Sequence, residues 1–278
     1  MSAMNELLET LTLEPIEVNL FRGRTPPNEQ GRIFGGQVIA QALFAAYKTI
    51  DGRVCHSLQS YFIRPGDPSV PVLYQVERSR DGKSFTTRRV IAIQHGEQIL
   101  NLACSFHTPE TGYEHQSAAP SVLPVEVVAD WRSPIEEIGG RTATLAERAI
   151  ELRPVNPMSN TNPKPMPPEV WVWCRAREDV GEDLVLNQAM LAYASDISLL
   201  GTAMRPHGLT WGLAQTASLD HIIWFHRPTN FSRWHLFAQD SPSASGGRGF
   251  NRGEIFREDG VLIASVAQEG LIRPLRPG

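Results

Sequence analysis

The spacing of hydrophobic residues predicts one central helix in each half of the chain. In GGQVIAQALFAAYKTI (35–50), apolar residues recur three and four positions apart, which is the spacing of a helix with an apolar face. LVLNQAMLAYASDISLLGTAM (184–204) is apolar nearly all round, which predicts a buried helix. Gly35 and Gly36 stand at the start of the first helix, where they allow another part of the backbone to approach closely.

Alternating apolar and polar residues predict about four antiparallel strands after each helix. The first set covers 56–63, 70–78, 85–94 and 98–107, and the second covers 217–227, 234–240, 249–258 and 261–272. Two more strands, 149–155 and 169–178, are predicted before the second helix. Short turns at 95–97 and 258–260 close the last hairpin of each set. The helix and the four strands that follow it therefore come in the same order in both halves.

The two halves also share sequence. YFIRPGD (61–67) matches WFHRPTN (224–230), with the aromatic, arginine and first proline positions at one constant offset. A longer match, between 82–103 and 247–267, follows in the same order and at nearly the same offset. Two matches in one register indicate an internal duplication. A long antiparallel sheet wrapped around one helix per half would bury a helix that is apolar all round.

Two segments rich in proline and polar residues, 107–124 and 153–168, interrupt the pattern. Proline disfavours both helices and central strands, so these segments are predicted to be linker and loop. We expect an N-terminal domain over 1–110, a linker over 111–145 and a C-terminal domain over 146–278.

Composition narrows the class of protein. The chain has 278 residues, of which 41% are hydrophobic, and a formal net charge of −4, so it can form a core and offers no basic surface for nucleic acid. Three separated cysteines without a CxxC argue against a disulfide scaffold and favour a reducing compartment. The sequence shows no signal peptide, no apolar run long enough to span a membrane, and no metal or nucleotide motif. We expect a cytoplasmic protein without a cofactor, a metal ion or a membrane partner.

The stretch SLDHIIWFHRP (218–228) holds a serine, an aspartate and two histidines. In one continuous strand Ser218 and Asp220 would share a face and His221 would point to the other, which excludes a Ser-His-Asp relay within the stretch. No G-x-S-x-G elbow occurs in the chain. Asp220, His221 and His226 are therefore interpreted as structural polar residues at strand ends and on sheet surfaces.

Two polar residues stand in apolar surroundings. Asp196 interrupts LAYASDISLLG, and a buried carboxylate needs hydrogen-bond donors or has a raised pKa. It is either an acid/base or water-orienting group, or it starts a new helical segment with Ser195 or Asp196 as the N-cap. Gln268 shares the predicted apolar face of VLIASVAQEG, where a hydrogen-bond bridge within the core is the alternative to a functional role.

An ordered set of motifs carries a resemblance to a known family. LFRG, FGGQVIAQAL, SYFIRPGD, YASD, RPHG, SLDH with WFHRP, RGFNRGE, DGVLIAS and QEG follow one another almost from end to end. With this set the chain resembles the acyl-CoA thioesterase II (TesB-type) family. The resemblance implies an α+β double hotdog, in which two tandem domains each wrap a long antiparallel sheet around a central helix. This agrees with the duplication.

The resemblance implies a hydrolytic site made of Asp196, Ser218 and Gln268. These residues would hold and polarise a water that hydrolyses a fatty acyl-CoA to the free acid and CoA. Ser218 stands where many relatives have threonine, and it keeps the hydroxyl. The rival route has Asp196 attack the thioester directly and form a mixed anhydride.

Other residues are weaker candidates for function. Arg248 and Arg252 could contact the phosphates of CoA, and His56 is a second candidate for the base, with an interstrand hydrogen bond as its alternative role. The resemblance also implies a homodimer or homotetramer. The competing interpretations are a non-catalytic acyl-CoA-binding or regulatory protein, which has no need of a buried acid, and a hydratase, which would need a histidine that the helix at 184–204 lacks.

Overall fold

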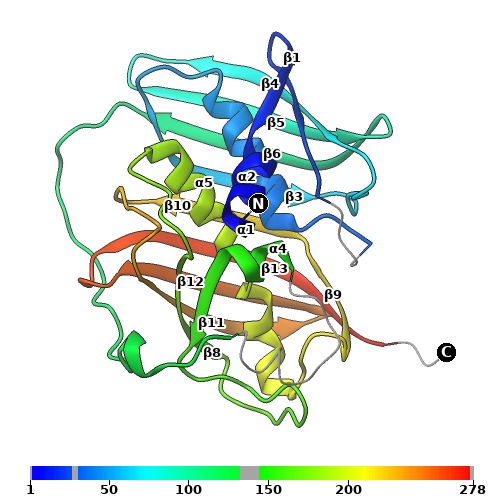
Figure 1. Ribbon diagram of the computed structural model, residues 1–278, viewed down its shortest axis with the longest axis vertical. Helices are drawn as coiled ribbons and strands as arrows, with labels where there is room; N and C mark the ends of the chain where they lie inside the picture. Colours follow the sequence, from blue (N-terminus) through cyan, green and yellow to red (C-terminus); the bar gives the residue numbers. More distant parts are fainter. Residues whose placement is uncertain (1, 27–30, 132–143, 276–278) are drawn as a thin grey trace.

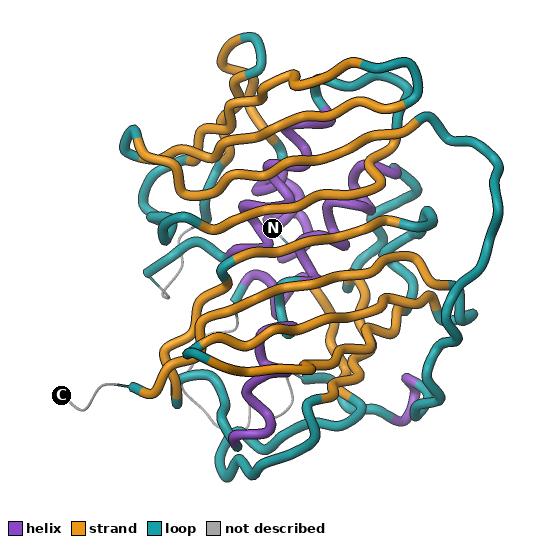
Figure 2. Tube along the Cα trace, turned by 180° about the vertical axis from the view of Figure 1, so that it is seen from behind, coloured by secondary structure: helices purple, strands orange, loops and turns teal. Residues whose placement is uncertain are grey.

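The computed structural model describes residues 2–26, 31–131 and 144–275, and it shows the double hotdog that the resemblance implies. All the described strands belong to one 13-stranded sheet. The strands form one continuous layer in Figure 2, with the helices behind it. The two halves of the chain lie one above the other in Figure 1, and their sheets are joined edge to edge.

Each half contains a helix, two strands, a second helix and four strands. The first half consists of α1 (Ala3–Leu11), β1 (Leu13–Glu17), β2 (Leu20–Gly23), α2 (Gly35–Tyr47), β3 (Val54–Phe62), β4 (Val72–Asp81), β5 (Phe85–Gln94) and β6 (Glu97–His107). The second contains α4 (Leu145–Ala149), β7 (Ile150–Pro154), β8 (Glu169–Ala176), α5 (Leu184–Ser195), β10 (Asp220–Phe225), β11 (His235–Ser245), β12 (Arg248–Arg257) and β13 (Leu262–Pro274), together with a 3-10 segment and one more short strand between α5 and β10. The predicted duplication is confirmed, and it extends to a short helix and two strands at the start of each half.

The order of strands in the sheet is symmetric about its centre. It runs β1-β2-β4-β5-β6-β3-β10-β13-β12-β11-β8-β7, so that β3 and β10 meet in the middle as equivalent strands. They pair antiparallel with Leu58 opposite Ile223. Antiparallel pairing of two central strands converts two half-sheets into one and leaves no open edge between the halves.

The two central helices pack against each other and against the sheet. Small side chains, Ala42 and Ala46 on α2 and Ala189 and Ala192 on α5, are all fully buried in this core. Ile39, also fully buried, contributes roughly 1.5–3 kcal/mol of hydrophobic stabilisation. The start of α2 lies beside the end of α5, where the rings of Phe34 and Tyr193 meet edge to face at 5.0 Å.

The predicted helix over 184–204 is wrong in its second part. α5 ends at Ser195, and after a turn the chain forms a 3-10 segment, η2 (Leu199–His207). Ser198, between the two segments, has a non-helical backbone conformation, and Pro206 lies inside η2. η2 packs on β12 and β13 through two glycines, since a Cβ at Gly249 or Gly270 would collide with η2 side chains. The first half has no described counterpart of η2.

The predicted strand over 217–227 is also interrupted. It divides at Leu219 into β9 (Ala214–Ser218), which pairs with β13, and β10, which pairs with both β13 and β3. The site described below depends on this break.

The connection between the halves runs over the surface. Residues 108–124 have no regular structure and follow the outside of the molecule, at the left of Figure 1, to a short 3-10 turn, η1 (Val125–Val127). The Trp173 indole donates to the Leu123 carbonyl at 2.9 Å, and Val125 joins an apolar cluster with Phe256 on the outer face of the second half-sheet. Residues 132–143 of the predicted linker lie outside the described residues, and the domain boundaries remain a prediction.

The loop predicted over 153–168 is confirmed beyond Pro154, where β7 ends. No helix in the described ranges is long and apolar enough to cross a membrane.

Candidate active site

Three elements of the second half bring Asp196, Ser218 and Gln268 together. Asp196 is the C-cap of α5, Ser218 ends β9, and Gln268 lies in β13. Asp196 Oδ1 accepts hydrogen bonds from Gln268 Nε2 at 2.6 Å and from Ser218 Oγ at 3.3 Å. Gln268 Nε2 also lies 3.2 Å from Ser218 Oγ. Residues that are up to 72 positions apart in sequence therefore form one contiguous polar cluster inside an apolar core.

The alternative interpretation of Asp196 as an N-cap is wrong. Asp196 follows the last residue of α5, and η2 begins after Ser198 without a side-chain cap. The carboxylate instead accepts a hydrogen bond from the backbone N–H of Gly36, in the first turn of α2. A helix N-terminus has free N–H groups and a partial positive charge, both of which stabilise a carboxylate.

The paired glycines at the start of α2 are explained by the same contact. A Cβ at Gly35 would lie 2.7 Å from Asp196 Oδ2, and a Cβ at Gly36 would collide with the carbonyl oxygen of Tyr193. The close approach of backbones that Gly35 and Gly36 predict is therefore an approach to the end of α5, and to Asp196 itself. The first half of the chain contributes the start of α2 to a cluster that is otherwise built by the second half.

Burial raises the pKa of Asp196 to about 6. Its side chain is only 4% exposed, and desolvation disfavours the charged form. Hydrogen bonds from Gln268, the Gly36 backbone and Ser218, with a smaller contribution from Arg32, oppose this effect. Asp196 is thus a carboxylate above about pH 6 and still basic enough to accept a proton from water.

A bulge between β9 and β10 turns His221 toward the cluster. Ser218 pairs with Gly270 and Ile222 pairs with Ala267, so three residues on one side face two on the other. The extra residue reverses the alternation of side chains after Leu219. The Asp220 carboxylate supports the bulge by accepting the Glu269 N–H at 2.7 Å.

The prediction that His221 faces away from Ser218 is therefore wrong, because the strand is not continuous. His221 is fully buried, with Nδ1 3.0 Å from Gln268 Nε2 and Nε2 2.9 Å from Ser195 Oγ. Burial lowers its pKa to about 3, so the imidazole is neutral. No hydrogen bond between Ser218 and His221 occurs in the described part of the chain, so no Ser-His-Asp relay forms. Apart from Asp220, whose carboxylate supports the bulge, no residue in the sequence indicates that the strand is interrupted here.

One acceptor atom of the Gln268 side chain takes part in no hydrogen bond with the described residues. Its Nε2 lies within hydrogen-bond distance of Asp196, Ser218 and His221, while its buried Oε1 has no partner among the described residues. A buried acceptor without a donor is costly in a folded protein and is often found at functional sites. The carbonyl of this amide is therefore free to accept a hydrogen bond from a bound water or substrate.

The two candidate arginines lie on the other face of the sheet. Arg248 and Arg252 are exposed, and each is paired with a carboxylate: Arg248 with Glu269 at 2.9 Å and Arg252 with Asp240 at 2.7 Å. Gln268 points to the inner face of the same sheet, where it is fully buried. The structure does not bring these arginines to the cluster, and their contact with CoA remains a prediction.

His56 also lies away from the cluster. Its Nε2 is 2.8 Å from Ser105 Oγ, across β3 and β6. Along β3 it is four residues from Ser60, which bonds to the His221 carbonyl, a separation of roughly 13 Å at the usual rise of a strand. The interstrand hydrogen bond accounts for His56, whereas its role as a base stays a prediction without a contact to support it.

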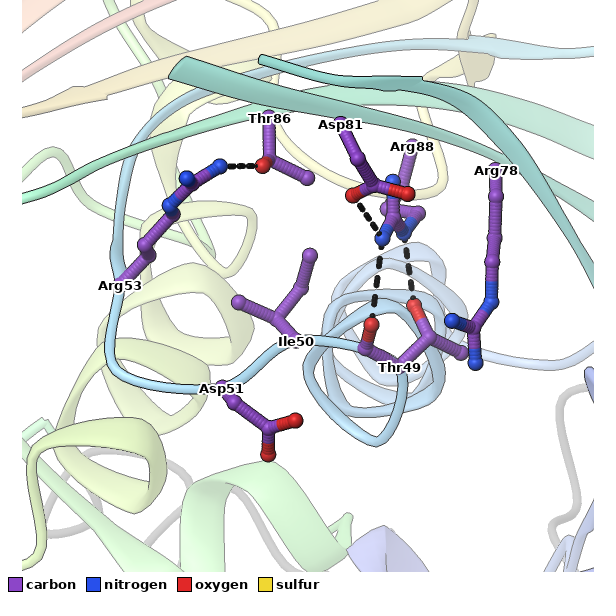
Figure 3. Close-up of a pocket in the computed structure, with 8 residues that line it drawn as sticks. All are labelled: Thr49, Ile50, Asp51, Arg53, Arg78, Asp81, Thr86 and Arg88. Carbon is purple, nitrogen blue, oxygen red and sulfur yellow. Dashed lines mark hydrogen bonds and ion pairs between the residues drawn. The ribbon is translucent and has the colours of Figure 1, made fainter. Parts of the chain in front are cut away.

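A second polar site lies at the opposite end of α2. It is a pocket of about 210 Å³, lined by three arginines and two aspartates among other residues (Figure 3). Arg88 is almost fully buried and donates to Thr49 and to Asp81, and Arg53 donates to Thr86 and to the carbonyl of Gly82. These donors are already occupied by the chain itself. Across the described ranges no group of histidine, cysteine and acidic residues is arranged to hold a metal ion.

Comparison with known proteins places the chain among thioesterases. Residues 141–271 match the family model described as acyl-CoA thioesterase, and residues 24–107 match the acyl-CoA thioesterase N-terminal domain. The chain is 41% identical to acyl-coenzyme A thioesterase 8 of Homo sapiens, over 95% of this chain and 87% of the human protein. It is 39% identical to acyl-CoA thioesterase 2 of Haemophilus influenzae, over 97% and 98%. The crystal structure of an acyl-CoA thioesterase II from Mycobacterium marinum superposes with a TM-score of 0.82 at 40% identity, over 97% and 98% of the two chains.

Proposed function

Because this chain belongs to the acyl-CoA thioesterase family, we propose that it hydrolyses fatty acyl-CoA to free fatty acid and CoA at the cluster of Asp196, Ser218 and Gln268. One observation carries the proposal. A buried carboxylate with a pKa of about 6 lies against two hydrogen-bonding side chains and the start of a helix. A protein that only binds acyl-CoA has no need of this buried acid, so the non-catalytic alternative leaves it unexplained.

The chemistry follows from the groups present. A water held between Asp196 and the free Oε1 of Gln268 can donate one hydrogen to each. Its oxygen attacks the thioester carbonyl carbon while Asp196 takes the proton, which is general-base catalysis worth about 10²–10⁴-fold. When the tetrahedral intermediate collapses, the C–S bond breaks and the proton passes to the CoA sulfur. The products are the carboxylic acid and CoA, and Asp196 returns to its starting state.

The developing oxyanion needs donors that are not already occupied. The Nε2 hydrogens of Gln268 are engaged with Asp196 and with His221. Because the Gly36 N–H already donates to Asp196, the Gly35 N–H, at the positive end of α2 that points at the cluster, is the donor proposed for the oxyanion. Ser218 keeps the carboxylate in place through its hydroxyl.

Thiol release from acyl-CoAs of graded chain length tests the proposal. Turnover by the wild type, with a defined preference among chain lengths, supports an acyl-CoA thioesterase. Binding without turnover at any length supports the non-catalytic alternative instead.

A single turnover in ¹⁸O-labelled water tests for the anhydride route with cleavage at the aspartyl carbonyl. If water attacks directly, the label enters only the released acid. If Asp196 attacks first, cleavage of the anhydride at the aspartyl carbonyl leaves label in Asp196, which mass spectrometry of the peptide containing this residue detects. We expect an unlabelled Asp196.

The rate should depend on pH through Asp196. Because the raised pKa leaves the carboxyl group protonated below about pH 6, kcat/KM is expected to rise tenfold per pH unit up to about pH 6 and to level off above it. The measurement is kcat/KM from pH 4.5 to 8.5 at constant ionic strength. An acid limb near pH 4 would contradict the buried carboxylate as the base.

We further propose that the enzyme acts as a homodimer or homotetramer in the cytoplasm. Light scattering of the purified protein determines the assembly, and cell fractionation determines the location.

A further inference from the structure

His221 is a buried titratable residue for which the proposed reaction has no use as an acid or a base. It is fully buried and neutral, and it contacts two other members of the site region, Gln268 and Ser195. A neutral imidazole has one donor and one acceptor, so its two neighbours determine which nitrogen carries the proton.

Ser195 identifies the protonated nitrogen. The Ser195 hydroxyl donates its only hydrogen to the carbonyl of Ala192, one turn earlier in α5, at 3.0 Å. With this hydrogen on the Ala192 carbonyl, Ser195 Oγ accepts from His221 Nε2, which lies 2.9 Å away. The proton is thus on Nε2, and Nδ1 has a lone pair.

The lone pair of Nδ1 in turn determines the orientation of the Gln268 amide. At 3.0 Å, Nδ1 can accept a hydrogen bond from an amide N–H but would repel an amide carbonyl. With one Nε2 hydrogen toward His221 and the other toward Asp196, the amide nitrogen faces the cluster. The carbonyl Oε1 is then left without a partner among the described residues.

We propose that His221 is a positioning residue, which holds the Gln268 amide in the one orientation that leaves Oε1 free to accept a hydrogen bond from the attacking water. The proposal rests on the proposed function of Asp196 and Gln268 in water activation. A chain of hydrogen bonds transmits the constraint from the Ala192 carbonyl through Ser195 and His221 to Gln268.

Asp196 alone does not fix this orientation at every pH. As a carboxylate it accepts from the amide nitrogen, but once protonated it can donate to Oε1 if the amide turns over. The nitrogen lone pair of His221 opposes that turn in both states. The other titratable and charged groups that interact with Asp196 are Arg32, which precedes α2, and Tyr193 on α5.

Two substitutions of His221 of similar size test the hydrogen bonds of its two ring nitrogens separately. In His221→Asn the side-chain oxygen can occupy the place of Nδ1 and accept from Gln268, while the bond to Ser195 is lost. In His221→Gln the amide reaches toward Ser195, and a methylene group replaces Nδ1. The first variant keeps the proposed function of the imidazole and the second removes it, and both keep a polar side chain in the core.

We expect His221→Gln to lower kcat by about 10–100-fold, because misplacement of a reacting group by about 1 Å can cost 10²-fold, and to change KM by less than about threefold. The acid limb of its kcat/KM profile is expected above pH 6, since a turned amide accepts from the protonated carboxyl group and favours it. His221→Asn is expected within about fivefold of the wild-type kcat, with the acid limb unchanged, because it retains the acceptor. Thermal unfolding confirms that both variants are folded.

Three outcomes would overturn the proposal. One is a wild-type kcat in His221→Gln. Another is an acid limb that moves down toward the ordinary pKa of aspartate, as expected if water merely enters a loosened core. The third is an equal loss in both variants. If His221→Gln does not fold, His221→Asn still decides the question. A loss of kcat beyond fivefold, or a shifted acid limb, in His221→Asn would contradict the role of the retained acceptor.

Asp196→Asn, measured in parallel, tests the underlying function. If that variant is active, the water-activation mechanism fails. An inactive Asp196→Asn together with an unaffected His221→Gln refutes only the positioning role.

Discussion

Replacing Asp196 with asparagine is expected to lower kcat for acyl-CoA hydrolysis by about 10²–10⁴-fold, the usual contribution of a general base. The asparagine oxygen can still accept from Gln268 Nε2, so the amide network around the site is retained, but no group remains to take the proton from water. KM should change little because the substitution is nearly isosteric. The measurement is thiol release under saturating substrate, and a kcat within tenfold of the wild type would remove Asp196 from the mechanism.

The pH dependence of folding stability provides the control for the Asp196→Asn variant, and the raised pKa of Asp196 determines its direction. The pKa of Asp196 is raised from 3.8 to about 6 in the folded protein, so the native state binds the proton more tightly than the unfolded state. The stabilising effect of that proton is present at low pH and is lost as the pH rises from about 4 to about 6. Above pH 6 the buried charge costs about 3 kcal/mol, from the usual energy per pKa unit.

Asp196→Asn carries no such charge. Its free energy of unfolding, relative to the wild type, should therefore increase between pH 4 and pH 7 by up to that amount, as measured by urea denaturation. An inactive variant that is relatively more stable at pH 7 than at pH 4 would show that the wild type keeps a destabilising carboxylate for its chemistry. A variant that is inactive because it is unfolded would contradict this account.

Replacing Gly36 with alanine is expected to destabilise the protein by about 2 kcal/mol. Overpacking a tight contact costs about 1–3 kcal/mol, and here the new methyl group meets the backbone carbonyl of Tyr193, which cannot move aside as a side chain could. The higher helix propensity of alanine offsets at most about 1 kcal/mol of this. The melting temperature should fall by about 3–4 °C, as measured by differential scanning calorimetry.

The same substitution should lower activity, because the Gly36 N–H donates to Asp196 and any shift of α2 lengthens that bond. Gly112→Ala is the matched control. A Cβ at Gly112 meets nothing within 4 Å and its backbone φ is ordinary, so we expect a change within about 0.5 kcal/mol and normal activity. Equal melting temperatures for the two variants would show that the start of α2 is not tightly packed against α5.

Most of the fold could be predicted from sequence because hydrophobic period and turn residues are local properties. The strand at 85–94 has the predicted bounds, the central helices start where predicted, and the duplicated order of helix and four strands is confirmed. The errors fall after Ser195 and at Leu219, where the chain leaves a regular element although its residues favour continuing it. In both places a contact with distant residues, through η2 on β12 and β13 or through the pairing of β9 with β13, outweighs the local preference.

The sequence by itself determined that this protein repeats one order of a helix and four antiparallel strands, with a polar Asp196 and Gln268 in apolar elements, because period, repetition and misplaced polarity are all visible along one chain. Only the tertiary structure decided what surrounds them. The Gly36 N–H reaches Asp196 because the first half of the chain packs its helix start against the helix end of the second half. His221 reaches Gln268 because of a single-residue bulge. Side-chain direction in a strand reverses with one inserted residue, and pairing with a distant strand, not local composition, determines where that residue lies.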